Sequence, residues 1–320
     1  MKKVLLAFGF CLFGITFASA QAGDDRLAEI KDASQKEGED GWTAGGGIGL
    51  DFAQLALFAP RVGAGSNRIG FGGLGSIYAR YTKGKFDWNN QGSLQLSVQR
   101  IGSNQQPFQK NLDVIRVSSR AGLQTGSEKW FMALEATAQT LLLPTYQGNV
   151  LSSDTLALLA NFLSPINVTV SPGIDYRPNE HFSFFYSPAS LRLIYVANDE
   201  IAKLNVHGNE ENSNSFLQLG SNLKGIYTNT FFEEKMSLTT TLDLYSNYLN
   251  NPQNLDVLWQ NDLGVTIFKN ISLNLVTELY YDHDILVQVD RNDNGIYEAG
   301  ELGRRVSFTE ALLIKYNYIF

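Results

Sequence analysis

The chain has 320 residues, of which 44% are hydrophobic and 12% aromatic, and its net charge is −7. This acidic balance argues against nucleic acid as a partner, because binding to phosphates needs an excess of lysine and arginine. A single cysteine, Cys11, excludes an internal disulfide framework.

The first residues predict an export signal. Two lysines precede an apolar run from Val4 to Phe17, and Ala18-Ser19-Ala20 then supplies a small-residue cleavage site. The run is too short and wrongly flanked to be a stable membrane span. We therefore expect residues 1–20 to be a signal peptide and the mature chain, which loses Cys11, to contain no thiol.

Residues 21–41 are polar and poor in aromatic residues, which predicts a flexible periplasmic lead-in. No later stretch is apolar enough for a membrane helix, but from Trp42 onward the polarity alternates with period two. A closed barrel is the other way to cross a bilayer, since it pairs every backbone group. We predict an all-β fold, an antiparallel transmembrane β-barrel of about twelve strands over residues 42–320. The strands are expected at 42–56, 70–82, 85–101, 111–124, 128–141, 161–177, 182–196, 215–228, 235–249, 254–268, 271–285 and 304–320.

The links between these segments alternate in length, as periplasmic turns and extracellular loops do. The link from Thr228 to Glu234 departs from the pattern, since it is long for a periplasmic turn. Pro188 interrupts the alternation of its segment and shifts it by one residue, which predicts a bulge. The apolar stretch from Leu156 to Phe162 is either the upper end of the next strand or a short element folding over the lumen.

Aromatic residues gather near the ends of the expected strands, and the chain ends in an aromatic residue within a strand. Interfacial belts of this kind distinguish membrane barrels from soluble β-sandwiches, which also alternate. We therefore expect the protein to lie in the cell outer membrane. Its expected partners are outer-membrane lipid and the machinery that inserts barrels.

Several motifs carry a family resemblance. They are the segments WTAGGGIGLDFAQ (42–54), FLSP (162–165), PGIDYRPN (172–179), YSP (186–188) and NPQNLDV (251–257) with Trp259. Together they resemble an uncharacterised family of Bacteroidota outer-membrane proteins, classed as a domain of unknown function. The resemblance covers nearly the whole mature chain and implies an outer-membrane barrel, but it brings no catalytic residues and no substrate.

The last long link matches a calcium-loop pattern, D-x-[DN]-x-[DN]-G-x5-E. Gly295 would make the sharp turn that wraps oxygen atoms around a hard cation. The predicted Ca²⁺ ligands are Asp290, Asn292, Asn294, the Ile296 carbonyl, Glu298 and Glu301. The flanks are strand-like, so this would be a lone loop on a hairpin that serves to order it. An acidic, turn-rich tip that binds nothing would show the same composition.

The alternation also predicts which charged side chains face the lumen. Ten of them point inward: Arg80, Arg116, Arg120, Glu135, Arg192, Lys224, Asp243, Asp262, Glu278 and Lys315. Bases and acids lie mainly on different strands, so they would either create a transverse field that selects solutes or pair with each other to fill a narrow barrel.

Catalysis is not expected. The three histidines are His181, His207 and His283. Only His283, with Asp282 and Asp284 beside it, is a candidate, and no serine lies at a telling spacing. The expected function is therefore a channel or transport-related barrel for small polar solutes. The alternative is a structural or binding barrel with a filled lumen and calcium-stabilised external loops, which transports nothing.

Overall fold

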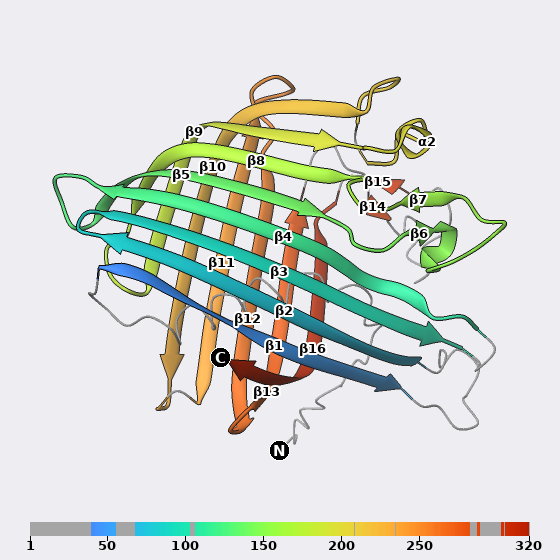
Figure 1. Ribbon diagram of the computed structural model, residues 1–320, viewed down its shortest axis with the longest axis horizontal. Helices are drawn as coiled ribbons and strands as arrows, with labels where there is room; N and C mark the ends of the chain where they lie inside the picture. Colours follow the sequence, from blue (N-terminus) through green and yellow to red (C-terminus); the bar gives the residue numbers. More distant parts are fainter. Residues whose placement is uncertain are drawn as a thin grey trace, which may run out of the picture.

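The computed structural model describes residues 40–55, 68–102, 106–207, 209–233, 235–281, 287–288, 302–303 and 305–319. Within these ranges the chain forms a closed barrel in the order β1-β16-β13-β12-β11-β10-β9-β8-β5-β4-β3-β2, with every neighbouring pair antiparallel (Figure 1). The barrel strands are β1 (Gly41–Leu55), β2 (Arg68–Lys83), β3 (Phe86–Ile101), β4 (Gln109–Gln124), β5 (Trp130–Thr140), β8 (Ile166–Tyr176), β9 (Phe182–Tyr195), β10 (Ser215–Phe231), β11 (Met236–Asn247), β12 (Asp256–Phe268), β13 (Ile271–Tyr281) and β16 (Ser307–Ile319). The predicted fold and strand number are confirmed. The predicted signal peptide and nearly all of the lead-in lie outside the described residues.

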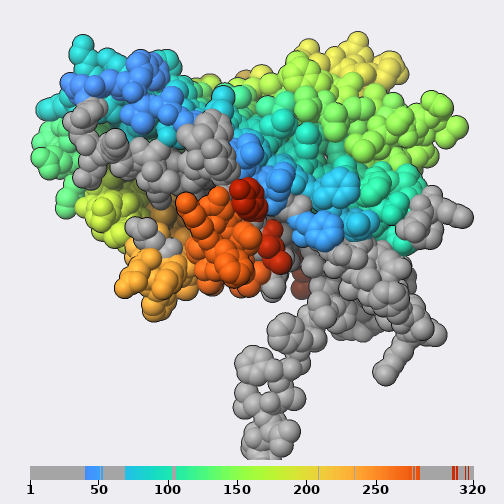
Figure 2. Space-filling view, turned by 60° about the horizontal axis from the view of Figure 1, so that its bottom comes forward, coloured from blue at the N-terminus to red at the C-terminus, as the bar shows by residue number. Residues whose placement is uncertain are grey.

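The first and last strands close the barrel. β1 pairs with β2 along its whole length, and with β16 from the Gly47–Ile319 pair to the Asp51–Lys315 pair. Figure 2 shows the result on the surface, where β16 (red) lies between β1 (blue) and β13 (orange). Closure satisfies backbone groups that lipid cannot hydrogen-bond.

The barrel is apolar outside and polar inside. Large hydrophobic side chains on the strands are exposed, among them Ile77, Met132 and Phe308, at 62–65%. Side chains pointing the other way are polar and buried, and they include Gln95, Ser171, Asp175, Asn222, Gln260, Asp262 and Asn274. An apolar outer surface is stable only against lipid, so this wall spans a membrane.

Among the described residues, no helix has the length and apolar character needed to cross a membrane.

Aromatic side chains cluster at the barrel end that carries the short turns. The ring of Trp42 lies 5.2 Å from that of Tyr81 and 5.7 Å from that of Trp88. Further around the same end, the rings of Trp130 and Tyr176 are 4.4 Å apart. This partial girdle marks one membrane interface, and the short turns identify it as the periplasmic one.

β9 contains the bulge predicted at Pro188. Its register against β10 passes from the Ser190–Gly220 pair to the Ser187–Asn222 pair, which leaves one extra residue on β9. Proline has no backbone N–H to give to the ladder, so the extra residue is accommodated there.

The link from Thr228 to Glu234 is shorter than the sequence indicated. β10 continues to Phe231, which pairs with Met236, and the chain reverses through Phe232 and Glu233 at φ values of 56° and 57°. Because the strand runs on to Phe231, the connection is a tight periplasmic turn like the others.

Two external loops pack against each other. The first contains β6 (Thr145–Tyr146), η1 (Gln147–Asn149) and β7 (Leu158–Ala160), and the second contains α2 (Asp199–Ala202). Val196, Ile201 and Ala202 form a buried cluster against which Leu158 packs. The Leu156 to Phe162 stretch contains the short strand β7, which pairs with β6 and is separate from β8, so it is not the upper end of that barrel strand.

Candidate functional site

The inner wall of the barrel holds the predicted lumen residues whose side chains the structure describes. Glu135 on β5 and Lys224 on β10 reach across the interior, and the Lys224 Nζ donates to Glu135 Oε1 at 2.6 Å. Strands β8 and β9 lie between β5 and β10 in the barrel order. The pair is therefore a chord across the lumen and does not join neighbouring strands. The Lys224 side chain keeps 22% of its surface accessible, and the Glu135 side chain keeps 17%.

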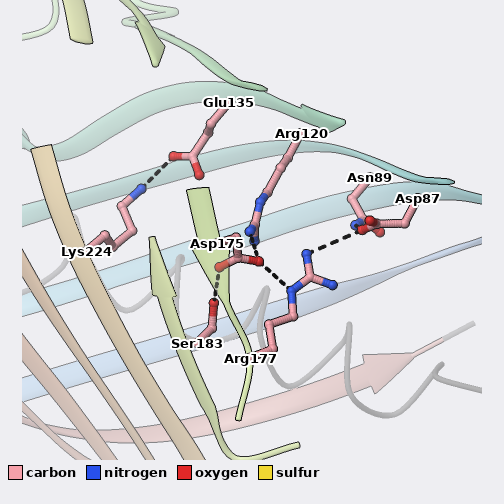
Figure 3. A network of polar contacts seen from close by, with 8 residues as sticks. All are labelled: Asp87, Asn89, Arg120, Glu135, Asp175, Arg177, Ser183 and Lys224. Carbon is pink, nitrogen blue, oxygen red and sulfur yellow. Dashed lines mark hydrogen bonds and ion pairs between the residues drawn. The ribbon is translucent and has the colours of Figure 1, made fainter. Parts of the chain in front are cut away.

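A second network lies nearer the periplasmic end (Figure 3). Asp175 is fully buried on β8 and forms ion pairs with Arg120 of β4 and with Arg177, whose Nε lies 2.5 Å from Asp175 Oδ2. Ser183 on β9 donates to the other carboxylate oxygen at 3.0 Å. Arg177 Nη2 also lies 3.4 Å from Asp87 Oδ2 on β3. We call Glu135, Lys224, Arg120, Asp175, Arg177 and Asp87 the charge network.

Three other predicted lumen residues bind neighbouring inner-face amides. Arg116 donates from Nε and Nη2 to Gln139 Oε1 at 3.1 and 2.6 Å. Asp243 accepts a hydrogen bond from Asn222, and Asp262 accepts one of 2.6 Å from Asn274. These contacts link neighbouring strands and line the wall, and they do not cross the lumen.

Arg192 and Arg80 are paired less fully. Arg192 Nη1 lies 3.9 Å from Asp256 Oδ2, and its guanidinium carbon lies 3.8 Å from the centre of the Tyr245 ring. Arg80 on β2 lies half-buried, and among the described residues its Nε has no hydrogen-bond partner. The same is true of Arg120 Nε, although its guanidinium is ion-paired.

The remaining predicted site residues fall outside what is described. This holds for the side chains of Glu278 and Lys315 and for the calcium loop Asp290 to Glu301 as a whole. The stem of that loop is described, and β14 (Val287–Gln288) pairs with β15 (Leu302–Gly303). Within the described residues no three His, Cys, Asp or Glu side chains are grouped to hold a metal.

The described histidines make local contacts. The Nδ1 of His181, in a periplasmic turn, lies 3.2 Å from the Thr228 carbonyl oxygen, and the Nε2 of His207 lies 2.7 Å from that of Leu159. The latter contact ties the two external loops together. His283, the one histidine considered for catalysis, lies outside the described residues.

Lys203 directly follows α2, outside the barrel wall, and its hydrogen bond to Glu200 raises the pKa of the lysine. Both side chains of this pair are exposed, and the pair lies in an external loop.

Sequence reasoning missed Asp87, Asp175 and Arg177. The first two follow the alternation of their own strands. Asp87 lies an even number of residues from buried Gln95 and so shares its face, and Asp175 faces inward because its neighbour Ile174 is exposed. Continuing each alternation to the strand end would have found them. Arg177 lies just beyond the end of β8, where successive side chains no longer alternate between the two faces of the sheet.

A polar, ion-paired interior and an apolar exterior are the construction of an outer-membrane β-barrel, and the protein is one. Comparison with family models gives a match over residues 54–146 to a family described as "Protein of unknown function (DUF3078)". This supports the resemblance to an uncharacterised family, while the Bacteroidota origin stays a prediction. No curated protein matches the chain.

Solved structures also match. An outer membrane channel from Pseudomonas putida is 11% identical with a TM-score of 0.40, covering 88% of this chain and 96% of that one. The translocator domain of the autotransporter NalP from Neisseria meningitidis is 8% identical with a TM-score of 0.36, covering 92% and 95%. The channel DcaP of Acinetobacter baumannii is 8% identical with a TM-score of 0.29, covering 90% and 99%. Scores this low carry no conclusion about function.

Proposed function

We propose that this protein is a narrow channel for small polar solutes across the outer membrane. The observation that carries the proposal is that the cross-lumen pair of Lys224 and Glu135 retains accessible surface although it lies inside the wall. Arg177 likewise keeps 26% of its side chain accessible. Interior charges that keep such surface border water, which is what a solute needs for passage.

The charge network sets what could pass. Lys224 and Arg120 each have an acidic partner, so each pair forms a short local dipole in place of a broad transverse field. A passing solute meets hydrogen-bond donors and acceptors at the same level, which favours polar molecules over apolar ones. The chord between β5 and β10 also narrows the lumen, which limits the size of the solute.

Planar bilayers containing the full chain test this proposal. We expect discrete conductance steps, and we expect Glu135→Gln and Lys224→Met to shift the reversal potential in a salt gradient in opposite directions. The first leaves a positive charge in the lumen and favours anions, and the second leaves a negative charge and favours cations. Lys203→Gln, directly after α2, is the matched control and should leave the potential unchanged. Demonstrated insertion without conductance would remove the proposal.

The packed external loops favour a second candidate, a binding barrel that transports nothing. Burial of Ile201 and Val196 gives these loops a fixed shape, and a fixed surface suits recognition. This candidate predicts no conductance in the same bilayer measurement, so one experiment separates the two.

For the last external loop we propose a structural Ca²⁺, held by the residues of the D-x-[DN]-x-[DN]-G-x5-E pattern. The pairing of β14 with β15 supports the proposal, because it makes the loop the tip of a hairpin, as the sequence predicted. We propose no catalytic activity for the chain.

A further inference from the structure

A second group of inner-face residues combines buried polar atoms that lack partners among the described residues with an arginine that has no close ion pair. Tyr245 and Asn247 on β11 are 2% and 7% exposed. Among the described residues, the Tyr245 hydroxyl, Asn247 Nδ2 and Gln218 Oε1 have no hydrogen-bond partner. Burying such a group without a partner costs about 1–3 kcal/mol, so three of them in one place call for an explanation.

The strand register brings these residues together around Gly220 of β10. Gly220 is the cross-strand partner of Asn247, and Gln218, two residues away on the same face, is the partner of Arg192 on β9. Gly220 has no side chain, and the Tyr245 ring lies over it: a Cβ added at Gly220 would come within 2.8 Å of the phenol oxygen. Arg192 then stacks on the same ring. We call Arg192, Gln218, Tyr245 and Asn247 the Gly220 cluster.

Arg192 gives this cluster an accessible positive charge. Its side chain is 32% exposed, and its distance of 3.9 Å to Asp256 is long beside the 2.6 Å between Lys224 and Glu135. A guanidinium has five N–H donors in a planar fork, and a single distant carboxylate oxygen occupies few of them. A second carboxylate can therefore bind to Arg192 without displacing a strong ion pair.

We propose that the Gly220 cluster binds a small hydroxylated carboxylate, of the sugar-acid class, in the external half of the lumen. The carboxylate binds the Arg192 guanidinium and draws it off the Tyr245 ring. This movement uncovers the phenol hydroxyl and the Asn247 amide, which donate to the ligand, while Gln218 Oε1 accepts from a ligand hydroxyl. The inference rests on the proposed channel function, because it names the solute class that the lumen admits.

Equilibrium binding of radiolabelled gluconate to the full chain in detergent tests the site without relying on conductance. Sorbitol, which has a hydroxymethyl group in place of the carboxylate, is the uncharged match and should not bind measurably. Tyr245→Phe should weaken gluconate binding about tenfold, the loss of one hydrogen bond, and Arg192→Met should weaken it about 10- to 100-fold. Tyr227→Phe, which removes a phenol hydroxyl elsewhere on β10, should bind as the native chain does.

Thermal unfolding of the same variants separates a binding role from a structural one. Since the Tyr245 hydroxyl has no hydrogen-bond partner among the described residues, Tyr245→Phe should leave the melting temperature unchanged or raise it. A lowered melting temperature would mean that the hydroxyl serves the fold, and the inference would be wrong. Gluconate binding that is absent, or equal in the native chain and in Arg192→Met, would also overturn it.

The bilayer measurement distinguishes failure of the site from failure of the channel. Conductance without gluconate binding would retain the channel and reject the Gly220 cluster as its site. Gluconate binding without conductance would retain the site and make the barrel a receptor for this ligand class.

Discussion

The lumen contains two polar regions that differ in how closely their charged groups are paired. In the charge network each carboxylate is ion-paired, as Asp175 is with Arg120 and Arg177. In the Gly220 cluster, a buried phenol and two amides have atoms without hydrogen-bond partners in the described part of the chain, and Arg192 lies 3.9 Å from its acid, Asp256. Asp87 Oδ1 and Arg120 Nε of the charge network also lack hydrogen-bond partners among the described residues, so the regions differ in their ion pairs. Close ion pairs fix the side chains of the charge network, whereas Arg192 is held loosely enough to bind a ligand.

Breaking the central ion pair should have the largest effect on stability. Glu135→Gln leaves the partly buried Lys224 without its closest acid, and losing a hydrogen bond between charged groups costs up to about 3 kcal/mol. The loss should appear in denaturant unfolding of the refolded barrel. Glu135→Gln combined with Lys224→Met should recover most of it, since neither charge of the pair remains. Equal stability of the single and double variants would show that the charges do not interact.

Filling the space above Gly220 should have the next largest effect. In Gly220→Ala the new methyl would contact the Ser246 carbonyl oxygen and the Tyr245 ring, so we expect a loss of about 2 kcal/mol in the same unfolding measurement. Gly75→Ala on β2 is the control, because nothing lies within 4 Å of its added Cβ. If both variants unfolded alike, the packing of Tyr245 over Gly220 would have no energetic importance.

Single hydroxyl deletions should distinguish the two regions directly. Ser183→Ala removes a hydrogen bond to the buried carboxylate of Asp175 and should cost about 1.5 kcal/mol. Tyr245→Phe removes a hydroxyl that bonds to nothing described and should cost nothing. Melting temperatures of the two variants, measured side by side, test the comparison. If Tyr245→Phe lowered the melting temperature as much as Ser183→Ala does, the proposed difference between the two regions would be wrong.

The calcium loop should show the smallest effect on the barrel itself. We expect Ca²⁺ to slow proteolytic cleavage within residues 289–301 and a chelator to restore it, with little change in the unfolding of the barrel. Glu301→Ala removes the proposed bidentate ligand and should make cleavage independent of Ca²⁺. Mass spectrometry of the fragments identifies the cut. Cleavage that ignores both chelator and substitution would show that the loop binds no calcium.

Alternation allowed the fold and the inner face to be predicted from the sequence. It placed Glu135 and Lys224 in the lumen because a strand turns successive side chains to opposite faces. It could not show that they meet, since contact between β5 and β10 depends on the tilt and diameter of the closed barrel. The Gly220 cluster was missed for a similar reason. Tyr245 was assigned no role, and the register between β10 and β11 cannot be derived from the sequence of either strand alone.

The turn after β10 shows a second limit. Its tight reversal uses left-handed backbone at Phe232 and Glu233, where neither residue type indicates such a conformation. The Pro188 bulge, by contrast, was predictable because proline leaves a visible shift in the polarity pattern.

The bulge at Pro188 determines which side chains in the second half of β9 face the lumen. Before it, Phe185 and Ser187 face the interior, and after it the inward positions are Ser190 and Arg192. The extra residue thus acts as a frameshift in side-chain direction. A chain lacking Ala189 would turn Arg192 toward the acyl chains, where an unpaired charge is destabilising. This one inserted residue keeps the Arg192 guanidinium facing the lumen.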